Sequence, residues 1–325
     1  MNTEELPESL LQAVTFFADE TRAHDFFVAM RWPDGVRCAH CESADIGGLS
    51  VSKNGKRRVW NCKACRKQFT AKIGTIFAES PLPLSKWLPA LWLVTNAKNG
   101  ISSCEMARAL KVTQKTAWFM GHRIRTAIQR GGGIVNCDGV FECDESFIGG
   151  VARNMHADKR AEKIKGRGPM GKSAVMGLLA RHGGGSEAKP ASKVVAVVVS
   201  STKRTVLLPH IQIHIPKGAE IHTDALRSYE GLSADYMHKV VDHAECYVKD
   251  GVHTNGLENF WSLLKRTIKG TYVHTAPFHL YRYLDEQTFR FNARKDEDGD
   301  RGRFLDVVKT TVGRRLTWKK LTAKS

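Results

Sequence analysis

Four cysteines in two closely spaced pairs constrain the fold of this chain more than any other feature. Cys38 and Cys41 form one CxxC motif, and Cys62 and Cys65 form a second one 20 residues later. Each motif places two thiolates about one edge of a zinc–sulfur tetrahedron apart, and the spacer is long enough for the second motif to complete the site. We therefore predict a structural zinc ribbon in which these four side chains bind Zn²⁺.

Disulfide bonds, a redox-active CxxC and rubredoxin-type iron are the alternatives for the four cysteines. The chain begins with acidic residues rather than a secretory leader, and no stretch approaches 18 uninterrupted apolar residues. We expect a cytoplasmic protein without a membrane span, and reducing conditions there disfavour disulfides. His40 lies inside the first motif, but four thiolates already fill a tetrahedral site, so we expect it to face solvent or DNA.

The segment between the two motifs predicts short strands joined by a hairpin turn at Asn54-Gly55, and Phe69 can cover the metal. The remaining cysteines have no metal-type spacing, and we interpret them as small core residues. These are Cys104, Cys137, Cys143 and Cys246.

The chain is strongly basic, with 50 Lys and Arg against 33 Asp and Glu, a net charge of +17. Such an excess is typical of proteins that bind a polyanion, because each cation that neutralises a phosphate releases condensed counterions. DNA, RNA and the ribosome remain open as partners, and a basic surface kept for solubility is the plain alternative. Residues 151–220 hold 13 Lys and Arg and 4 Asp and Glu, so over half of the excess lies in one central segment.

Residues 101–130 predict two short helices joined by a turn, with Ser102 or Ser103 capping the first helix and Thr113 the second. This pattern is typical of a helix-turn-helix, and a plain helical hairpin is the alternative. The residues that would begin the second helix and reach base edges or phosphates are Gln114, Lys115 and Trp118.

Residues 139–150 alternate in polarity between flanking glycines and predict a strand. Period 2 puts Phe141, Cys143, Glu145 and Phe147 on an apolar face, and Glu142, Asp144 and Ser146 on the other. A charged Asp144 in mid-strand is costly unless a metal ion offsets it. The alternative is an edge strand with a solvated acidic face.

Four further strands are expected, at 172–180, 193–201, 219–224 and a short fifth at 238–243, with a helix within 201–215. The strand at 219–224 ends in Asp224. Ligands of α/β sheets usually bind where strands end at the carboxyl edge, which makes Asp224 a second candidate.

Residues 253–272 predict a helix. Its buried stripe comprises Leu257, Phe260, Leu264 and Ile268, and its adjacent face comprises Glu258, Trp261, Ser262 and Lys265. Glu258 has a structural alternative, a capping box in which Asn255 is the N-cap. Otherwise Asp144, Asp224 and Glu258 can converge to hold two divalent ions about 3.5–4 Å apart, the geometry for displacement at a phosphodiester.

The sequence GRGPMGKS, residues 166–173, matches the P-loop pattern GxxxxGK[ST]. A P-loop must follow a buried strand, but the preceding residues are charged and poor in β-formers. We interpret the segment as a basic loop that contacts phosphates, with Arg167 and Lys172 as the candidates.

Taken together, the two CxxC motifs, ECDESFIGG, GRGPMGKS, IHTDALRSY, VHTNGLENFWSLLKR and HLYRYLDEQTFRFNAR resemble bacterial insertion-sequence transposases of the ISXO type, which are related to Merlin-type elements. The resemblance covers roughly residues 20–295. It implies an RNase H-like DDE domain that uses Mg²⁺, with Mn²⁺ as a substitute, and binds the terminal inverted repeats of its own element as double-stranded DNA. Pairing two DNA ends implies a homodimer or a larger assembly.

The resemblance also implies roles for individual residues. Asp144 and Asp224 match metal ligands, and Glu258 is our choice for the third position, with Asn255 as the alternative because members of this group vary there. Lys265 would reach the DNA backbone near the scissile phosphate, although a solvated lysine is the alternative. Other expected DNA contacts are Gln114, Lys115, Arg167, Lys172 and Arg266.

We therefore predict a multidomain chain with an N-terminal helical segment (1–30), a zinc ribbon (31–75), a helix-turn-helix-like region (80–130), an α/β RNase H-like catalytic domain with a mixed five-stranded sheet (136–295) and a basic C-terminal tail (296–325). The tail is either a loosely ordered extension that contacts phosphates or a packed helix. The expected function is metal-dependent cleavage and strand transfer of DNA by a nucleoid-associated transposase. The alternatives are a catalytically silent zinc-ribbon regulator and a structure-selective nuclease.

Overall fold

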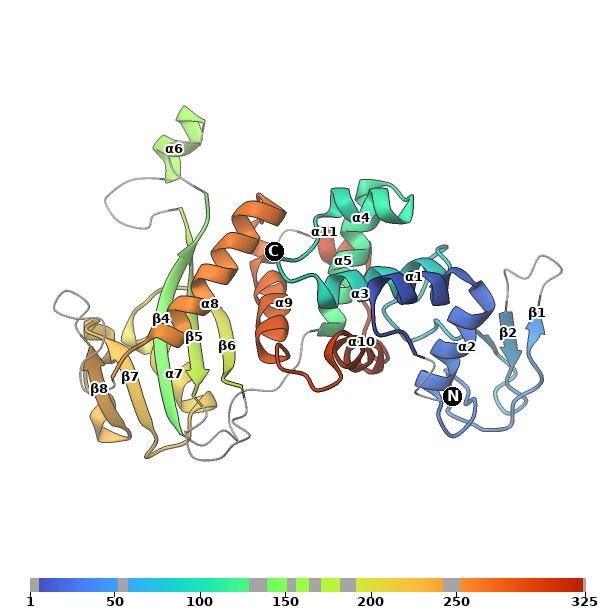
Figure 1. Cartoon of the computed structure of the whole chain (residues 1–325), viewed down its shortest axis with the longest axis horizontal. Helices are drawn as coiled ribbons and strands as arrows, with labels where there is room; N and C mark the ends of the chain where they lie inside the picture. The colour runs from blue at the N-terminus through green and yellow to red at the C-terminus, as the bar shows by residue number, and fades with distance from the viewer. Residues whose placement is uncertain are drawn as a thin grey trace. The chain divides into compact units, whose positions relative to one another are not determined.

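The computed structural model describes residues 6–51, 58–128, 139–150, 156–163, 171–181, 191–241 and 252–323. The chain divides into two compact units: residues 1–129 with 296–325 form the first, and residues 130–295 form the second. The chain therefore returns to the first unit after completing the second (Figure 1). None of the helices in the described ranges combines the length and the apolar character that a bilayer-spanning segment needs.

The core of the first unit is helical. Its main helices are α1 (Leu10–Ala18), α2 (Glu20–Arg31), α3 (Leu84–Asn96) and α10 (Gly299–Lys309). Phe17 and Phe26 lie 5.1 Å apart between ring centroids, and Phe304 of α10 lies 5.6 Å from Phe17. Of the two alternatives for the C-terminal segment, the packed helix is therefore correct over the span of α10.

Two helices joined by a short turn follow α3, as predicted: α4 (Ser103–Leu110) and α5 (Gln114–Ile128). Ser102 caps α4 in a capping box with Glu105. Lys111 ends α4 in the left-handed region at φ 49°, and the Thr113 hydroxyl accepts the Thr116 N–H at 3.2 Å at the start of α5. The short helix α11 (Trp318–Thr322) completes the described part of this unit.

The ribbon has three short antiparallel strands in its described part, in the order β1 (Ser50–Val51), β2 (Arg58–Asn61) and β3 (Gln68–Phe69). Phe69 is 1% exposed and stacks on Trp60 at 5.7 Å. The turn predicted at Asn54-Gly55 lies outside the described residues.

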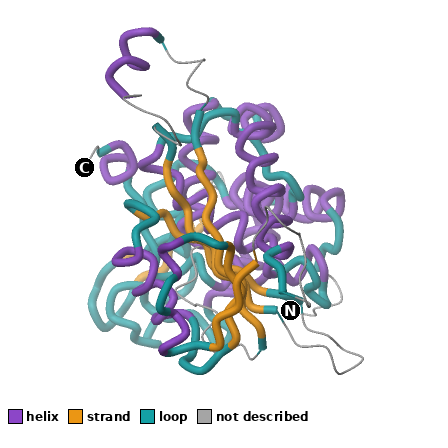
Figure 2. The backbone as a smooth tube through the Cα atoms, turned by 90° about the vertical axis from the view of Figure 1, so that its left-hand side faces the viewer, coloured by secondary structure: helices purple, strands orange, loops and turns teal. Residues whose placement is uncertain are grey.

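In the described part of the second unit, five strands form one mixed sheet, as predicted (Figure 2). The strands are β4 (Val140–Ile148), β5 (Ser173–Ala180), β6 (Lys193–Val199), β7 (Glu220–Asp224) and β8 (Met237–Val241). Their order is β6-β5-β4-β7-β8. Pairs β4–β5 and β5–β6 are antiparallel, whereas β4–β7 and β7–β8 are parallel.

Helices cover both faces of this sheet. The predicted helix α7 (Arg204–His214) packs on one face, and α8 (Asn255–Arg266) and α9 (Leu280–Asn292) pack on the other (Figure 1). The remaining described helical segments are α6 (Ala157–Lys163), the π-helix η5 (Thr267–Tyr272) and the 3₁₀ turns η3 (Arg227–Tyr229), η4 (Leu232–Ala234) and η6 (Pro277–His279).

The burial of β4 differs from the simple alternation predicted for it. The expected apolar Phe147 is 36% exposed, whereas Glu142 and Ser146 on the opposite face are 0% and 4% exposed. The alternative of an edge strand is wrong, because β4 lies between β5 and β7. Helices cover both faces of this central strand, so polar positions are buried as well as apolar ones, and its two-residue period no longer sorts buried from exposed positions.

Candidate active site

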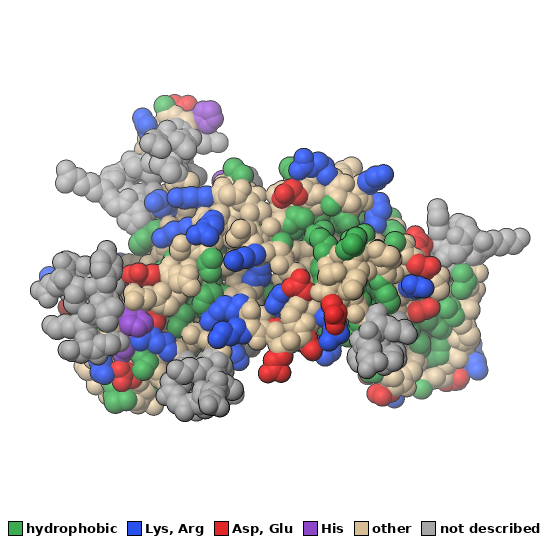
Figure 3. Space-filling model, in the orientation of Figure 1, with side chains coloured by type: hydrophobic (Ala, Val, Ile, Leu, Met, Phe, Trp, Pro, Cys, Tyr) green, Lys and Arg blue, Asp and Glu red, His purple; other side chains and the backbone are tan. Residues whose placement is uncertain are grey.

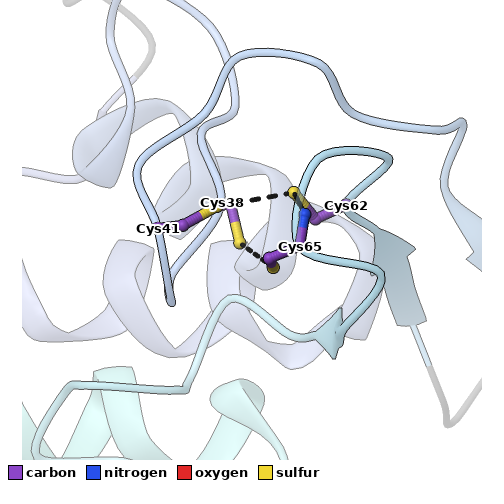
Figure 4. A group of neighbouring side chains, drawn as sticks. All are labelled: Cys38, Cys41, Cys62 and Cys65. Atoms are coloured by element: carbon purple, nitrogen blue, oxygen red, sulfur yellow. Dashed lines mark hydrogen bonds between the residues drawn. The ribbon is translucent and has the colours of Figure 1, made fainter.

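The four cysteines of the two CxxC motifs meet in the ribbon (Figure 4). Their sulfur atoms all lie within 4.8 Å of one another, and the distances from Cys38 to Cys65 and from Cys41 to Cys62 are each 3.6 Å. Tetrahedral zinc–thiolate bonds of about 2.3 Å require sulfur–sulfur edges of about 3.8 Å. The residues therefore fit a structural Zn²⁺ ion.

Backbone groups around the sulfurs favour the thiolate form that zinc requires. The N–H of His40 donates to the Cys38 sulfur at 3.3 Å, and the N–H of Cys65 donates to the Cys62 sulfur at 3.4 Å. Burial by itself would raise the pKa of Cys38, but backbone N–H groups and the neighbouring thiols lower that pKa to about 6, whereas the neighbouring thiols raise the pKa of Cys41. The exposed His40 ring lies 3.3 Å from the Gln68 carbonyl oxygen.

The other cysteines follow the prediction only in part. Cys143 is buried in the core of the second unit, as expected, but Cys104 is exposed on α4. The core interpretation of Cys104 is wrong, because the short helix α4 turns that position outward. Cys137 and Cys246 lie outside the described residues.

The register of two parallel strands places Asp144 beside Asp224. The last pair between β4 and β7 joins Cys143 to Thr223, and each aspartate is the next residue on its strand. Side chains two residues apart share a face, so both aspartates lie on the side of the sheet that α8 covers. Asp224 ends β7, where its Oδ1 accepts the N–H of Leu226 at 3.2 Å.

Glu258 reaches the same region from the first turn of α8. Burial and, less strongly, the charges of Asp224 and Glu258 raise the pKa of Asp144, whereas two hydrogen bonds lower it, and the net pKa is about 6. The carboxylates of Asp224 and Glu258 are therefore both close enough to Asp144 to repel its charge. Within the described residues, the four ribbon cysteines are the only group of potential metal ligands that lie close together; the three carboxylates do not form such a cluster.

The structural alternative for Glu258 does not hold. The N-cap of α8 is Thr254, without a side-chain hydrogen bond, and Asn255 is the first helical residue. The capping box of Asn255 with Glu258 is therefore absent. The prediction of a buried stripe on this helix is confirmed, because Leu257, Phe260 and Leu264 are fully buried.

Comparisons with known proteins agree with this geometry. A family model described as "ISXO2-like transposase domain" matches residues 136–292, and one described as "Transposase zinc-ribbon domain" matches residues 18–68. A Haemophilus influenzae "uncharacterized transposase-like protein" is 31% identical over 101 residues, which cover 31% of this chain and 81% of the relative. The "uncharacterized protein in transposable element ISH50" of Halobacterium salinarum is 26% identical over 267 residues, which cover 79% of this chain and 85% of the relative.

The chain belongs to the ISXO2-like transposase family. The resemblance found in its motifs is thereby confirmed. The transposase carries a zinc-ribbon domain together with its transposase domain, and the acidic site lies within the matched segment 136–292.

Basic residues of the second unit lie on α8 and next to β5. Lys and Arg side chains gather around α8 on the face of the second unit drawn in Figure 3. Lys265 and Arg266 are exposed in the last turn of α8, and Lys172 is exposed just before β5. Arg167 lies outside the described residues.

In the first unit, three residues were predicted to reach DNA from the start of α5: Trp118 is half-buried, whereas Gln114 and Lys115 are exposed but have partners. The side-chain amide of Gln114 donates to the Ser103 hydroxyl at 2.8 Å. The ammonium group of Lys115 lies 4.7 Å from the ring centroid of Trp318.

Trp261 contacts the site directly, a role that its helical face had not suggested. Its indole N–H donates to Oδ2 of Asp144 at 2.8 Å. Gly177 lies opposite Asp144 on β5, where a Cβ atom would be 2.6 Å from the Trp261 ring and 2.8 Å from Leu257. A glycine inside a strand marks such a close approach, and this is the signal by which the contact could have been found in the sequence.

We expect Gly177→Ala to destabilise the transposase by about 1–3 kcal/mol, because the added methyl group must displace a packed indole ring. Urea unfolding measures this loss. Gly270→Ala is the matched control, because a Cβ at Gly270 would meet nothing within 4 Å. Equal stability of the two variants would contradict the close packing at Gly177.

The raised pKa of Asp144 has a consequence for stability. Its pKa of about 6 in the folded chain exceeds the ordinary value of 3.8, so ionised Asp144 costs stability above pH 6, and this cost fades as the pH falls toward 3.8. In buffer without divalent ions, the stability of Asp144→Asn relative to the natural protein should therefore rise between pH 4 and pH 7, by up to about 3 kcal/mol. Denaturant unfolding at each pH tests this, and a difference independent of pH would refute it.

Proposed function

We propose that this transposase binds the terminal inverted repeats of an insertion sequence and catalyses metal-dependent cleavage and strand transfer of DNA. The observation that carries the proposal is the gathering of Asp144, Asp224 and Glu258 on one face of the sheet, inside the family-matched segment. Two acids come from adjacent parallel strands and one from the covering helix.

An RNase H-like fold for residues 136–295 is part of the proposal. Strands β4, β5 and β6 form an antiparallel meander, and β7 and β8 extend the sheet in parallel from the other edge of β4. In such a sheet the acids of the first and fourth strands become neighbours, which supports a shared role for Asp144 and Asp224.

Carboxylate oxygens are the ligands that Mg²⁺ prefers. A bound cation would also stabilise the ionised form of buried acids that repel one another. Asp144, Asp224 and Glu258 would hold two Mg²⁺ ions, or Mn²⁺ in their place, with Asn255 as the alternative to Glu258. When bound, these ions supply a Lewis acid that activates the attacking hydroxyl group and stabilises the leaving oxygen. No serine or tyrosine nucleophile is then required.

The chain's own residues orient the reaction. Trp261 holds one carboxylate oxygen of Asp144 in place. Lys265, Arg266, Lys172 and Arg167 would contact the DNA backbone near the scissile phosphate, while the zinc ribbon and the α4–α5 pair, through Gln114 and Lys115, would bind the element's ends as a helix-turn-helix. A homodimer or larger assembly would bring the two ends together.

The test uses end DNA taken from the inverted repeats that flank the gene. Binding measured by gel shift, together with nicking and joining products in Mg²⁺ or Mn²⁺, supports a transposase. Binding without cleavage in either metal would favour a catalytically silent regulator. Cleavage without joined products would favour a structure-selective nuclease.

A further inference from the structure

Glu142 is a fully buried acid that lies beside the acidic site. The proposed chemistry gives it no role. It precedes Asp144 by two residues, so both side chains lie on the face of β4 under α8. Its Oε2 accepts the backbone N–H of Leu257 at 2.8 Å, and its Oε1 accepts Nε–H of Arg181. A buried carboxylate is costly unless it is paired, and here both oxygens have partners.

The start of α8 is shaped to receive this carboxylate. The first backbone N–H groups of a helix have no partner within the helix, and its positive end favours an anion. A Cβ atom at Gly256 would lie 2.9 Å from each carboxylate oxygen of Glu142. Only glycine therefore lets the helix start approach the acid this closely.

Arg181 extends the same attachment to the segment that leads into α8. It follows β5 directly, and its guanidinium group donates both to Glu142 and to the carbonyl oxygen of His253. The His253 N–H in turn lies 3.5 Å from Nδ1 of His222 on β7. The start of α8 is thus joined to three neighbouring strands of the sheet.

Two hydrogen bonds together set the register of the helix on the strand. Glu142 bonds Leu257, and Asp144 bonds Trp261. Residues two apart on a strand are about 6.6–6.8 Å apart, and residues four apart on a helix rise about 6 Å. The two spacings match, so a shift of α8 by one residue would break both bonds.

We propose that Glu142 is a positioning residue of the transposase, which holds the first turn of α8 so that Glu258, the residue after Leu257, faces Asp144 and Asp224. The proposal rests on the proposed function, in which these three acids hold the metal ions. Without Glu142, the guanidinium group of Arg181 and the N–H of Leu257 lose a shared acceptor, and the helix start is free to move.

The experiment measures Mn²⁺ bound to the complex of the full chain with end DNA, by electron paramagnetic resonance corrected for Mn²⁺ bound to DNA alone. We expect Glu142→Gln to weaken Mn²⁺ binding about tenfold while end binding stays within about twofold. Because Glu142 acts through Glu258, the double variant with Glu258→Gln should bind Mn²⁺ no more weakly than Glu258→Gln alone.

Glu286→Gln is the matched control. Glu286 is also 0% exposed and is paired with Arg290 four residues later, but it lies on α9 outside the site. Both variants should have a lower free energy of unfolding than the natural protein. Only Glu142→Gln should bind Mn²⁺ more weakly. Equal Mn²⁺ affinity in these two variants, or additive losses with Glu258→Gln, would overturn the positioning role.

A second variant keeps every charge. Gly256→Ala pushes a methyl group against the Glu142 carboxylate and should weaken Mn²⁺ binding in the same direction, whereas Gly270→Ala should not. If Glu142→Gln does not fold, Gly256→Ala takes its place as the test. Unchanged Mn²⁺ affinity in Gly256→Ala then overturns the positioning role. Mn²⁺ binding that depends on Asp144 and Glu258 but not on Glu142 overturns this role alone. Mn²⁺ binding that is indifferent to Asp144→Asn overturns the proposed function as well.

Discussion

Asp144→Asn is expected to reduce metal-dependent cleavage of end DNA by about 10³-fold or more and to leave end binding within about twofold. Asp144 is partly buried, and the charges of Asp224 and Glu258 both act on it. Asparagine removes one negative charge from the set that would hold the cations. The residues proposed to contact DNA lie elsewhere, so binding should persist.

The measurement compares cleavage rates and gel-shift affinities on the same end DNA. Asp235→Asn is the control. Asp235 is an acid of the same unit that lies outside the acidic site, and its carboxylate pairs with Lys217 at 3.0 Å. Undiminished cleavage by Asp144→Asn would remove Asp144 from the catalytic machinery. A parallel loss of binding would instead indicate a damaged fold.

Removal of the zinc ligands should have the second large effect. The described strands of the ribbon are only two to four residues long, so their hydrogen bonds and the packing of Trp60 on Phe69 cannot hold the ribbon folded alone. Structural zinc contributes about 10–16 kcal/mol of apparent binding free energy in small zinc domains. We therefore expect Cys38→Ser to lose Zn²⁺, unfold the ribbon and weaken end binding at least tenfold.

Zinc content per chain, protease cleavage within the ribbon and gel-shift affinity test this expectation. The control is Cys104→Ser, which removes an exposed cysteine of α4 and should change none of the three. If a zinc-free, protease-sensitive Cys38→Ser protein still bound end DNA with full affinity, the folded ribbon would not be required for DNA recognition.

Local patterns in the sequence predicted the elements that depend on neighbours along the chain. The CxxC spacing identified all four cysteines of the ribbon cluster, and the periodicity of residues 253–272 identified the buried stripe of α8. Both succeed because a tight turn and a helical face are set by residues within a few positions. The resemblance to transposases likewise rests on short motifs in a definite order.

Other features depended on partners far along the chain. From the sequence, Glu142 could be assigned only to the polar face of a strand. Its hydrogen-bond partners leave no local signal, because Leu257 lies 115 positions away and Arg181 lies 39 positions away. The exposure of Phe147 was missed for the same reason. The exposure of Cys104 was missed because the position faces outward on the short helix α4. An alternating pattern does not report whether a helix will later cover its polar side.

Local spacing and short motifs were enough to predict the four cysteines of the ribbon cluster, the five strands, the three candidate acids and the family of this protein. They did not reveal which face of β4 the helix α8 covers, that the C-terminal α10 joins the core of the first unit, or that a buried glutamate bonds the start of α8; these are seen only in the folded chain. Those outcomes depend on long-range packing, in which a polar group is tolerated inside only where a distant residue supplies its hydrogen-bond partner.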